Sequence, residues 1–270
     1  MQTECDDLGA EVAELAQLCA GLSDAQWATP TDFYGWSAWD EVAHLCYFDE
    51  TALLATRDAE AFAQHAAELM QLMNSGGHIS VVAREHFAGL GGAALLARWQ
   101  DTSHTLLRAL RQRDPKDRLP WYGPSMSARS FATARLMETW AHGQDVWDAM
   151  GRVRAAAPRH RAIAHLGVST LGWTFANRGL PVPGPTPWVA LDAPVAGAAP
   201  WTWGEPSDTD WLRGSALDFC LLVTQRRHRS DTALQWAGPT AEAWTLLAQC
   251  FAGPPADGPG PGLRRTRAPA

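Results

Sequence analysis

Apolar residues recur every three or four positions through most of the first 177 residues, and this periodicity constrains the fold more than any other feature of the chain. In a helix of 3.6 residues per turn such residues share one face, which is buried against other helices. The pattern therefore predicts a mainly α protein built on a helix bundle. The expected helices cover residues 3–22, 37–56, 58–73, 93–113, 127–150 and 158–177.

Local signals mark where several of these helices begin and end. Ser37-Ala-Trp-Asp40 has the spacing of a capping box, which places a helix start at this point. Asn74-Ser-Gly-Gly77 and Asp114-Pro115 break the chain, and Gly151 follows the last apolar position of its segment. These signals support the helix boundaries that the periodicity indicates.

The composition changes after Gly179, because proline and glycine become frequent between residues 180 and 206. Residues 188–191 and 201–203 resemble short strands, and two further helices are expected. They cover residues 212–227 and 239–251. We therefore expect a helix bundle over residues 1–179, a small α+β module over residues 180–253 and a disordered tail over residues 254–270.

Composition narrows the class of protein. With 46% hydrophobic residues, a chain of 270 residues can bury a core without covalent cross-links. No segment has the roughly 18–20 apolar residues that span a bilayer, and the start of the chain lacks the pattern of a secretion signal. The five cysteines are scattered and contain no Cys-x-x-Cys pair, so neither a disulfide framework nor a thiolate zinc site is expected. These features predict a soluble cytoplasmic protein with no membrane partner.

Charge and residue usage point to small-molecule chemistry. The formal net charge is −7 with both signs interspersed, which excludes the basic face expected of a nucleic-acid-binding protein. Lys116 is the only lysine among many arginines, a usage typical of high-GC genomes and consistent with an actinobacterial source. Fourteen tryptophans exceed the usual need of a core. We expect some of them to line a pocket for a small-molecule substrate.

Glu138 and His142 are the first candidates for chemistry. Residues four apart on a helix project from nearly the same side, so both side chains can point at one atom. The ordinary alternative is a local hydrogen bond between the two. His44 adds weight to a metal site, because it is a single histidine in the largely apolar run from Val42 to Cys46. A histidine in such a run is also common as a core residue, so the residues alone leave both interpretations open.

Two segments resemble the metal-binding helices of the DinB-like bundle superfamily. They are Trp36-Ser-Ala-Trp-Asp-Glu-Val-Ala-His-Leu45 and Arg135-Leu-Met-Glu-Thr-Trp-Ala-His-Gly-Gln-Asp-Val146. Among named members, the chain resembles mycothiol-dependent maleylpyruvate isomerase over residues 1–179. Residues 218–255 also resemble the C-terminal part of an actinobacterial branch known only as metal-binding. The resemblance implies a DinB-like four-helix bundle with a small C-terminal α+β module.

The resemblance also implies a ligand set. The isomerase binds its metal through a histidine and a glutamate–histidine pair, and these positions fall on His44, Glu138 and His142. Two imidazoles and one carboxylate leave a coordination position open, as in catalytic sites, and suit Zn²⁺, with Ni²⁺, Fe²⁺ or Mn²⁺ as alternatives. Asp145 and Asp40 are candidates to orient the ligand imidazoles. Asp40 also has the competing role of capping-box acid.

The source of a nucleophile separates the mechanisms. Cys46 is close to His44 in sequence, but two residues along a helix place it about 200° around the axis, turned away from the ligands. A thiol reaction at this site therefore needs sulfur from a cofactor. The resemblance implies mycothiol, whose thiolate adds to a cis double bond and leaves after rotation. Isomerisation and thiol-S-transfer are not separable on this basis.

Outside the ligand set, two pairs of residues are candidates for binding. Trp121 and Tyr122 lie in the loop before the metal-bearing helix. We expect them at the mouth of the site, where they would bind the cofactor. The alternative is that they only anchor the loop. Arg226 and Arg227 are the candidate catalytic residues in the C-terminal module, as carboxylate-binding guanidinium groups. Their alternative role is to complement a helix C-terminus.

Two other functions stay open from the sequence. One is a thiol-independent cyclase, isomerase or hydrolase of secondary metabolism, in which the metal acts as a Lewis acid. The other is a non-catalytic metal-binding module. The open coordination position argues against a purely structural ion.

Overall fold

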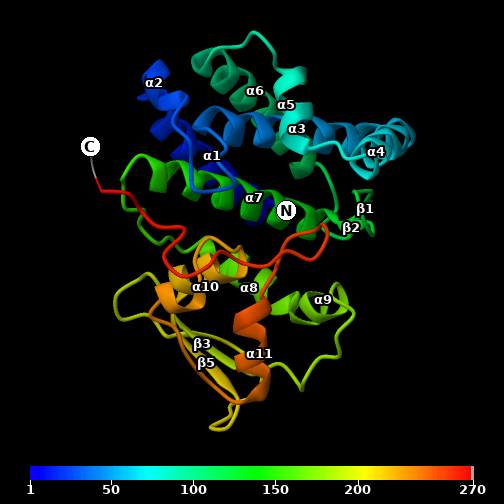
Figure 1. Cartoon of the computed structure of the whole chain (residues 1–270). Helices are drawn as coiled ribbons and strands as arrows, with labels where there is room; N and C mark the ends of the chain where they lie inside the picture. The colour runs from blue at the N-terminus through cyan, green and yellow to red at the C-terminus, as the bar shows by residue number, and fades with distance from the viewer. Residues whose placement is uncertain (269–270) are drawn as a thin grey trace. The chain divides into compact units, whose positions relative to one another are not determined.

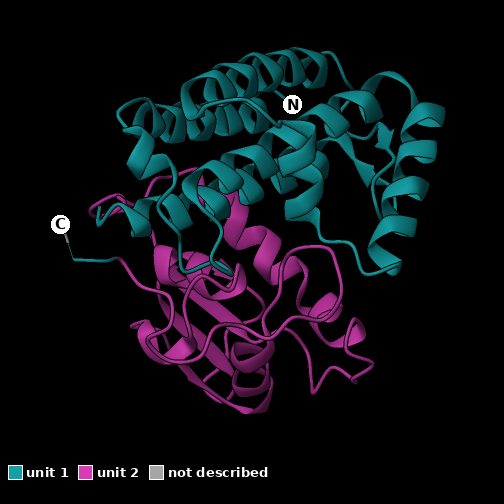
Figure 2. Ribbon diagram, turned by 45° about the horizontal axis from the view of Figure 1, so that its top comes forward, with its two compact units in different colours: residues 1–152, 267–270 teal, residues 153–266 magenta. Residues whose placement is uncertain are grey.

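The computed structural model describes residues 1–268, which form two compact units (Figure 2). Unit 1 contains residues 1–152 together with residues 267–268, and unit 2 contains residues 153–266. Within the described residues, no helix combines the length and the apolar character needed to cross a membrane.

Unit 1 is a four-helix bundle with short additional elements (Figure 1). In the bundle, α1 packs on α6 and α7, and α3 also packs on α6 and α7, so the four helices form a closed ring. Two short helices (α2 and α5), the 16-residue helix α4 and a two-stranded hairpin connect them. In chain order the elements are α1 (Gln2–Ala20), α2 (Asp24–Trp27), α3 (Ala38–Arg57), α4 (Ala59–Asn74), α5 (Ile79–His86), α6 (Gly92–Arg111), β1 (Arg118–Leu119), β2 (Met126–Ser127) and α7 (Ala128–Ala149).

The predicted start of α3 is confirmed. The Ser37 side chain accepts a hydrogen bond from the backbone N–H of Asp40, and the Asp40 carboxylate accepts one from the Ser37 N–H, which completes the capping box. Ser127 caps α7 by accepting from the Ser130 N–H. The two helices that carry the candidate ligands therefore have defined starts.

A buried network around Asp49 joins three helices of the bundle. Asp49 lies on α3 and accepts hydrogen bonds from the Trp99 indole and the Ser103 hydroxyl on α6, at 2.9 and 2.8 Å. On its other oxygen it pairs with Arg135 of α7 at 2.9 Å, and both charged side chains are 3% exposed. A buried carboxylate needs such partners, and this network ties α3 to α7 in one register.

Unit 2 is a small α+β unit. Its four-stranded sheet has the order β4-β3-β5-β6, with β3 parallel to β5 and the other neighbours antiparallel. Helix α8 packs on α10, and α9 packs on α11. The elements are α8 (His160–Ser169), α9 (Leu171–Ala176), β3 (Trp188–Asp192), β4 (Trp201–Trp203), β5 (Trp211–Ser215), α10 (Ala216–Val223), a 3₁₀ turn (Arg229–Asp231), β6 (Gln235–Ala237) and α11 (Pro239–Leu247).

Two expected helices of unit 2 were partly wrong. Residues 212–215 belong to strand β5, where Leu212 is fully buried and pairs with β3, and the helix begins only after Ser215 caps α10. The helix expected over 158–177 is two helices separated at Thr170. The Thr170 hydroxyl donates to the Leu166 carbonyl at 2.8 Å, a local bond that competes with helix continuation.

The division into units also differs from the boundary expected at residue 179. Residues 153–179 are grouped with unit 2, because α8 packs closely on α10. A Cβ on Gly167 would lie 2.9 Å from the Val223 side chain, so only glycine allows this approach.

The C-terminal tail differs from expectation as well. Residues 254–268, expected to be disordered, form no helix or strand but are hydrogen-bonded, for example from Arg264 to the Gln225 carbonyl. Residues 269–270 of that tail lie outside the described residues.

Candidate metal centre

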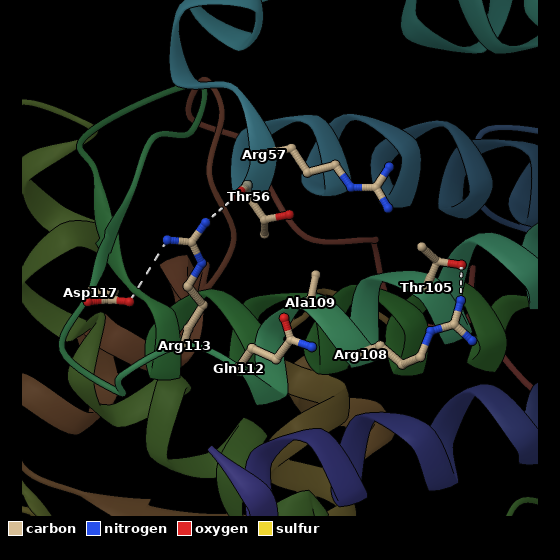
Figure 3. Close-up of a pocket in the computed structure, with 8 residues that line it drawn as sticks. All are labelled: Thr56, Arg57, Thr105, Arg108, Ala109, Gln112, Arg113 and Asp117. Carbon is tan, nitrogen blue, oxygen red and sulfur yellow. Dashed lines mark hydrogen bonds and ion pairs between the residues drawn. The ribbon is translucent and has the colours of Figure 1, made fainter.

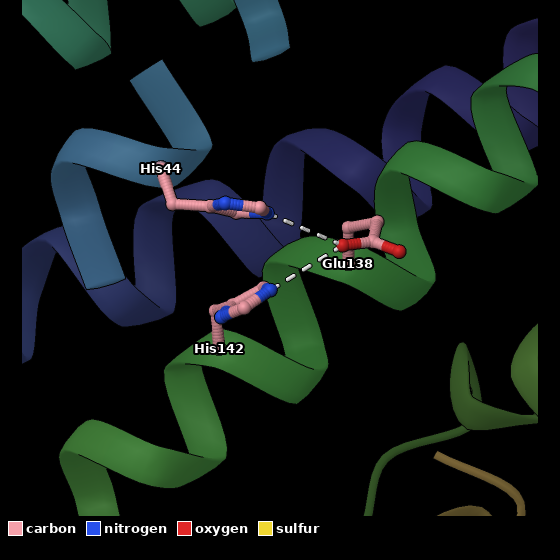
Figure 4. A group of neighbouring side chains, drawn as sticks. All are labelled: His44, Glu138 and His142. Carbon is pink, nitrogen blue, oxygen red and sulfur yellow. Dashed lines mark ion pairs between the residues drawn. The ribbon is translucent and has the colours of Figure 1, made fainter. Parts of the chain in front are cut away.

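The structure brings His44, Glu138 and His142 together inside unit 1 (Figure 4). His44 comes from α3, and the other two lie one turn apart on α7. The Glu138 Oε2 atom is 3.7 Å from His44 Nε2 and 3.4 Å from His142 Nε2. The three ligand atoms all lie within 4.8 Å of one another.

These spacings match the donor spacing of a single metal ion. Ligand atoms about 2.1 Å from a tetrahedral zinc are roughly 3.4 Å apart. The two separations in the structure, 3.4 and 3.7 Å, need little adjustment to reach this value. Two nitrogens and one oxygen are also a donor set that divalent zinc and its first-row neighbours accept. The residues therefore fit a metal ion.

Glu41 holds the far side of His142. Its Oε2 atom lies 2.7 Å from His142 Nδ1, and its other oxygen accepts a 2.8 Å hydrogen bond from the Thr31 hydroxyl. Glu41 is fully buried. Since a carboxylate accepts, the imidazole donates from Nδ1, and Nε2 is the ring nitrogen that would bind a metal. This arrangement selects the tautomer that binds a metal.

Asp145 forms a second group with Glu41 and His142. The ligand atoms of these three residues are within 4.8 Å of one another, and all three residues are buried. This group shares His142 with the first cluster, and its Glu41 contacts the other ring nitrogen, Nδ1. We therefore interpret it as the support of one metal site rather than as a second site.

The two histidines keep Glu138 ionised. Burial by itself raises the pKa of the Glu138 carboxyl, but hydrogen bonds and charge from His142 and His44 outweigh it and hold the pKa well below its usual range. The side chain remains 25% exposed. An ionised carboxylate beside two imidazoles is the state that a cation requires.

Aromatic rings surround the two imidazoles. Trp36 stacks on His142 at 5.8 Å between ring centroids and contacts His44 at 5.3 Å. Phe33 meets His142 edge-on at 5.2 Å, and Phe48 contacts His44 at 4.7 Å. These apolar faces limit water access to the ligands and lower the local polarity.

Trp121 and Tyr122 lie behind Phe48 in the same aromatic group. Their rings are 6.2 and 5.6 Å from the ring of Phe48. The Tyr122 hydroxyl is 3.2 Å from His65 Nε2, and burial raises the pKa of this phenol. They thus approach the histidine cluster through Phe48, and cofactor binding by them stays a prediction.

Both carboxylate oxygens of Asp40 bind residues other than His44. One oxygen pairs with Arg84 Nε at 2.6 Å, and the other binds Ser37 and Arg84 Nη2. Its capping role is therefore the one that its contacts support. Glu41, the next residue, has the orienting contact that we had expected of Asp40, but to His142 instead of His44.

The thiol of Cys46 is buried and points away from the ligands. Its Sγ atom is 3.9 Å from Glu50, and burial together with the charges of Glu50 and Asp49 raises the pKa of this thiol. All five cysteines are buried free thiols. Unit 1 therefore places no reactive thiolate beside the candidate metal centre.

Arg226 and Arg227 are buried within unit 2, just after α10. Arg226 donates to the Thr224 carbonyl and Arg227 to the Arg226 carbonyl, both at 2.8 Å. These contacts agree with the alternative of complementing a helix C-terminus. Carboxylate binding by either residue stays a prediction.

Five residues around the ligands were not predicted from the sequence: Glu41, Thr31, Phe33, Trp36 and Phe48. Glu41 and Phe48 lie three residues before and four residues after His44, so helical spacing alone places them near it. Thr31 and Phe33 come from the loop before α3, whose path no periodicity indicates.

Comparison with known proteins identifies relatives over most of the chain. The family model "Mycothiol maleylpyruvate isomerase N-terminal domain" matches residues 8–147. Uncharacterized proteins from two strains of Mycobacterium tuberculosis are each 42% identical over 254 residues, covering 93% of this chain and 96% of each relative. The mycobacterial relatives are consistent with the expected actinobacterial source.

Solved structures share the fold at low identity. The crystal structure of the mycothiol-dependent maleylpyruvate isomerase aligns with a TM-score of 0.56 at 13% identity, covering 87% of this chain and 92% of that chain. A histidine-to-alanine mutant of that isomerase aligns with a TM-score of 0.52 at 13% identity. That alignment covers 82% of this chain and 87% of the mutant's chain. The fold is thus the DinB-like bundle with a small α+β unit that we expected. The chain belongs to the mycothiol maleylpyruvate isomerase N-terminal domain family.

Proposed function

We propose that this protein is a metal-dependent enzyme of the maleylpyruvate isomerase type, which uses a low-molecular-weight thiol such as mycothiol to isomerise or conjugate a small unsaturated substrate. The observation that carries the proposal is the convergence of His44, Glu138 and His142, with Glu41 holding the Nδ1 side of His142. Family membership supports the same class. Five buried free cysteines suit a reducing cytoplasm.

His44 Nε2, His142 Nε2 and Glu138 Oε2 would hold the metal, and their donor set suits zinc. When bound, a divalent ion at three protein ligands supplies Lewis acidity and lowers the pKa of a thiol or water. Glu41 keeps the His142 ring in the metal-binding tautomer, and Phe33, Trp36 and Phe48 restrict water around the imidazoles.

The sulfur comes from outside the chain in this proposal, since Cys46 is buried with a raised pKa. In the isomerase reaction the thiolate adds to one carbon of a cis double bond conjugated to a carbonyl, and the electron pair moves to the carbonyl oxygen. Rotation about the new single bond and loss of the thiolate restore the double bond as trans. In the transferase reaction the addition product is protonated on carbon and the thiolate does not leave, so the thioether is the product.

Metal and thiol binding test the proposal together. Wild type is expected to contain about one metal ion per chain and to bind mycothiol with proton release, because the bound form is a thiolate. His44→Ala and Glu138→Ala should lose both properties. Cys46→Ala, on the same helix as His44, is the matched control and should keep both. Equal metal content in wild type, His44→Ala and Glu138→Ala would reject the metal centre.

The thiol branch has its own test. Wild type loaded with zinc should convert maleylpyruvate to its trans isomer only when mycothiol is present, or should form a mycothiol adduct if the activity is transfer. Absorbance and mass spectrometry distinguish the two products. No thiol binding by calorimetry at millimolar concentration would reject thiol chemistry, even if the metal is bound.

A further inference from the structure

A polar pocket lies at the C-terminal ends of α3 and α6, within unit 1 (Figure 3). Its volume is about 540 Å³, which is large enough for a small metabolite. It is lined by Thr56, Arg57, Thr105, Arg108, Ala109, Gln112, Arg113 and Asp117. Arg57 is thirteen residues beyond His44 on α3, which corresponds to about 20 Å along the helix. The cavity is therefore distinct from the metal centre.

Positive charge is concentrated in this cavity. Arg57, Arg108 and Arg113 contribute three guanidinium groups, and Asp117 is the only acidic residue of the lining. The whole chain has a formal charge of −7, so the cluster does not reflect general basicity. Hydroxyl and amide groups stand among the guanidinium groups, as Figure 3 shows. Such a lining favours an anionic oxygen-rich ligand.

The guanidinium groups retain donors for a ligand. Among residues 1–268 no hydrogen bond or ion pair engages the Arg57 side chain. Arg108 uses its Nη2 atom for a 2.9 Å bond to the Thr105 hydroxyl. Arg113 donates from Nη2 to the Thr56 carbonyl and lies 3.9 Å from Asp117 through Nη1. Each arginine has five N–H donors, so most of them are still available.

Helix electrostatics account for only part of this arrangement. Arginines near the ends of α3 and α6 complement the negative C-terminal poles of these helices. That role does not require the side chains to line a common pocket. Ala109, whose side chain is a single methyl group, leaves the space between the arginines open. The cavity, and not the charge alone, indicates a ligand.

We propose that this cavity binds a small oxyanion with at least two negative charges, either a phosphate ester or a polycarboxylate. Planar guanidinium groups bind both kinds of oxygen pair in the same bidentate manner. The side-chain amide of Gln112 supplies an additional N–H donor. The proposal does not depend on the metal centre.

Calorimetric titration of the metal-free protein at low salt tests this site, with inorganic pyrophosphate and citrate as probes. Metal-free protein is needed because both probes chelate divalent ions. We expect saturable binding of at least one probe. Tighter binding of pyrophosphate would indicate a phosphate site, and tighter binding of citrate would indicate a carboxylate site. Arg57→Gln and Arg108→Gln should each weaken binding at least about tenfold, because each removes a charge-assisted hydrogen bond.

Arg111→Gln is the matched control, since Arg111 lies on α6 outside the cavity and pairs with Asp6. It should change affinity by less than about twofold. Ala109→Phe fills the cavity without changing charge and should abolish binding, with circular dichroism to verify the fold. Absence of binding by both probes at about 10 mM, or equal weakening by Arg111→Gln and Arg57→Gln, would overturn the proposal.

Discussion

His142 uses both ring nitrogens, and this single residue links the buried interior of unit 1 to the candidate metal centre. Nδ1 meets Glu41 at 2.7 Å, while Nε2 faces Glu138 at 3.4 Å. Because the two nitrogens of a neutral imidazole have opposite roles, the contact of one decides the role of the other. The chemistry of the site therefore depends on a carboxylate that does not itself face the metal position.

Glu41→Gln is expected to lower metal affinity about 10- to 100-fold while the fold remains intact. An amide can still accept from Nδ1, but it no longer adds negative charge to the imidazole. Competition with a chelator of known affinity measures the change. Glu50→Gln, on the same helix but paired with Arg98 and His86, should have no effect. Unchanged affinity in Glu41→Gln would show that Glu41 serves the fold alone.

His160 makes unit 2 sensitive to acid. Burial and the nearby charges of Arg154 and Arg159 lower the pKa of His160 to about 3. The unfolded chain takes up a proton near pH 6.5, whereas the folded chain stays neutral until about pH 3. Stability from this residue is therefore complete above pH 6.5 and falls as the pH decreases toward 3.

Urea unfolding of wild type and His160→Gln at pH 7 and pH 4.5 tests this behaviour. Wild type should lose more stability on acidification than the variant, by up to about 1.4 kcal/mol per pH unit. His104→Gln replaces an exposed histidine and should follow wild type. Parallel losses in wild type and His160→Gln would contradict the assignment.

Among the elements, α3 and α7 position the site because a buried ion pair fixes their register. Asp49 and Arg135 lie close in sequence to His44 and Glu138, respectively, and bind each other in the core. The long helices and the Ser37 cap were predicted well, since periodicity and capping are local. Strand β5 was missed because Trp211–Ser215 is too short to show a period, and only its pairing with β3 selects a strand.

Asp49→Asn should destabilise the protein by about 3–5 kcal/mol, because it leaves Arg135 buried without its counter-charge. Denaturant unfolding measures the loss. Asp6→Asn breaks an exposed pair with Arg111 and should cost less than about 1 kcal/mol. Similar losses for the two variants would show that the Asp49 network contributes no more than a surface pair.

At the scale of the whole molecule, unit 1 contains the complete candidate ligand set, and unit 2 has its own sheet and core. Metal bound to the folded state alone must raise the stability of the protein by mass action. Free zinc at 100 times its dissociation constant corresponds to about 2.7 kcal/mol.

Thermal melting with and without zinc checks this linkage. Wild type should melt at a higher temperature with zinc and return to its original value after chelation. His44→Ala should show no zinc-dependent shift, while His86→Ala, a histidine outside the ligand set, should respond as wild type does. A shift that persists in His44→Ala would place the stabilising ion elsewhere.

The sequence by itself predicted the helical class, the bundle with a following α+β unit and, through its resemblance to the isomerase family, the three ligand candidates. Helical period, caps and the four-residue spacing of Glu138 and His142 are properties of neighbouring residues, so they can be read along the chain. Tertiary structure alone decided that Glu41 and not Asp40 contacts a ligand imidazole, that Phe33 and Trp36 pack on the site, and that arginines at the ends of α3 and α6 line one open pocket. These features depend on contacts between segments far apart in the chain, which only packing brings together.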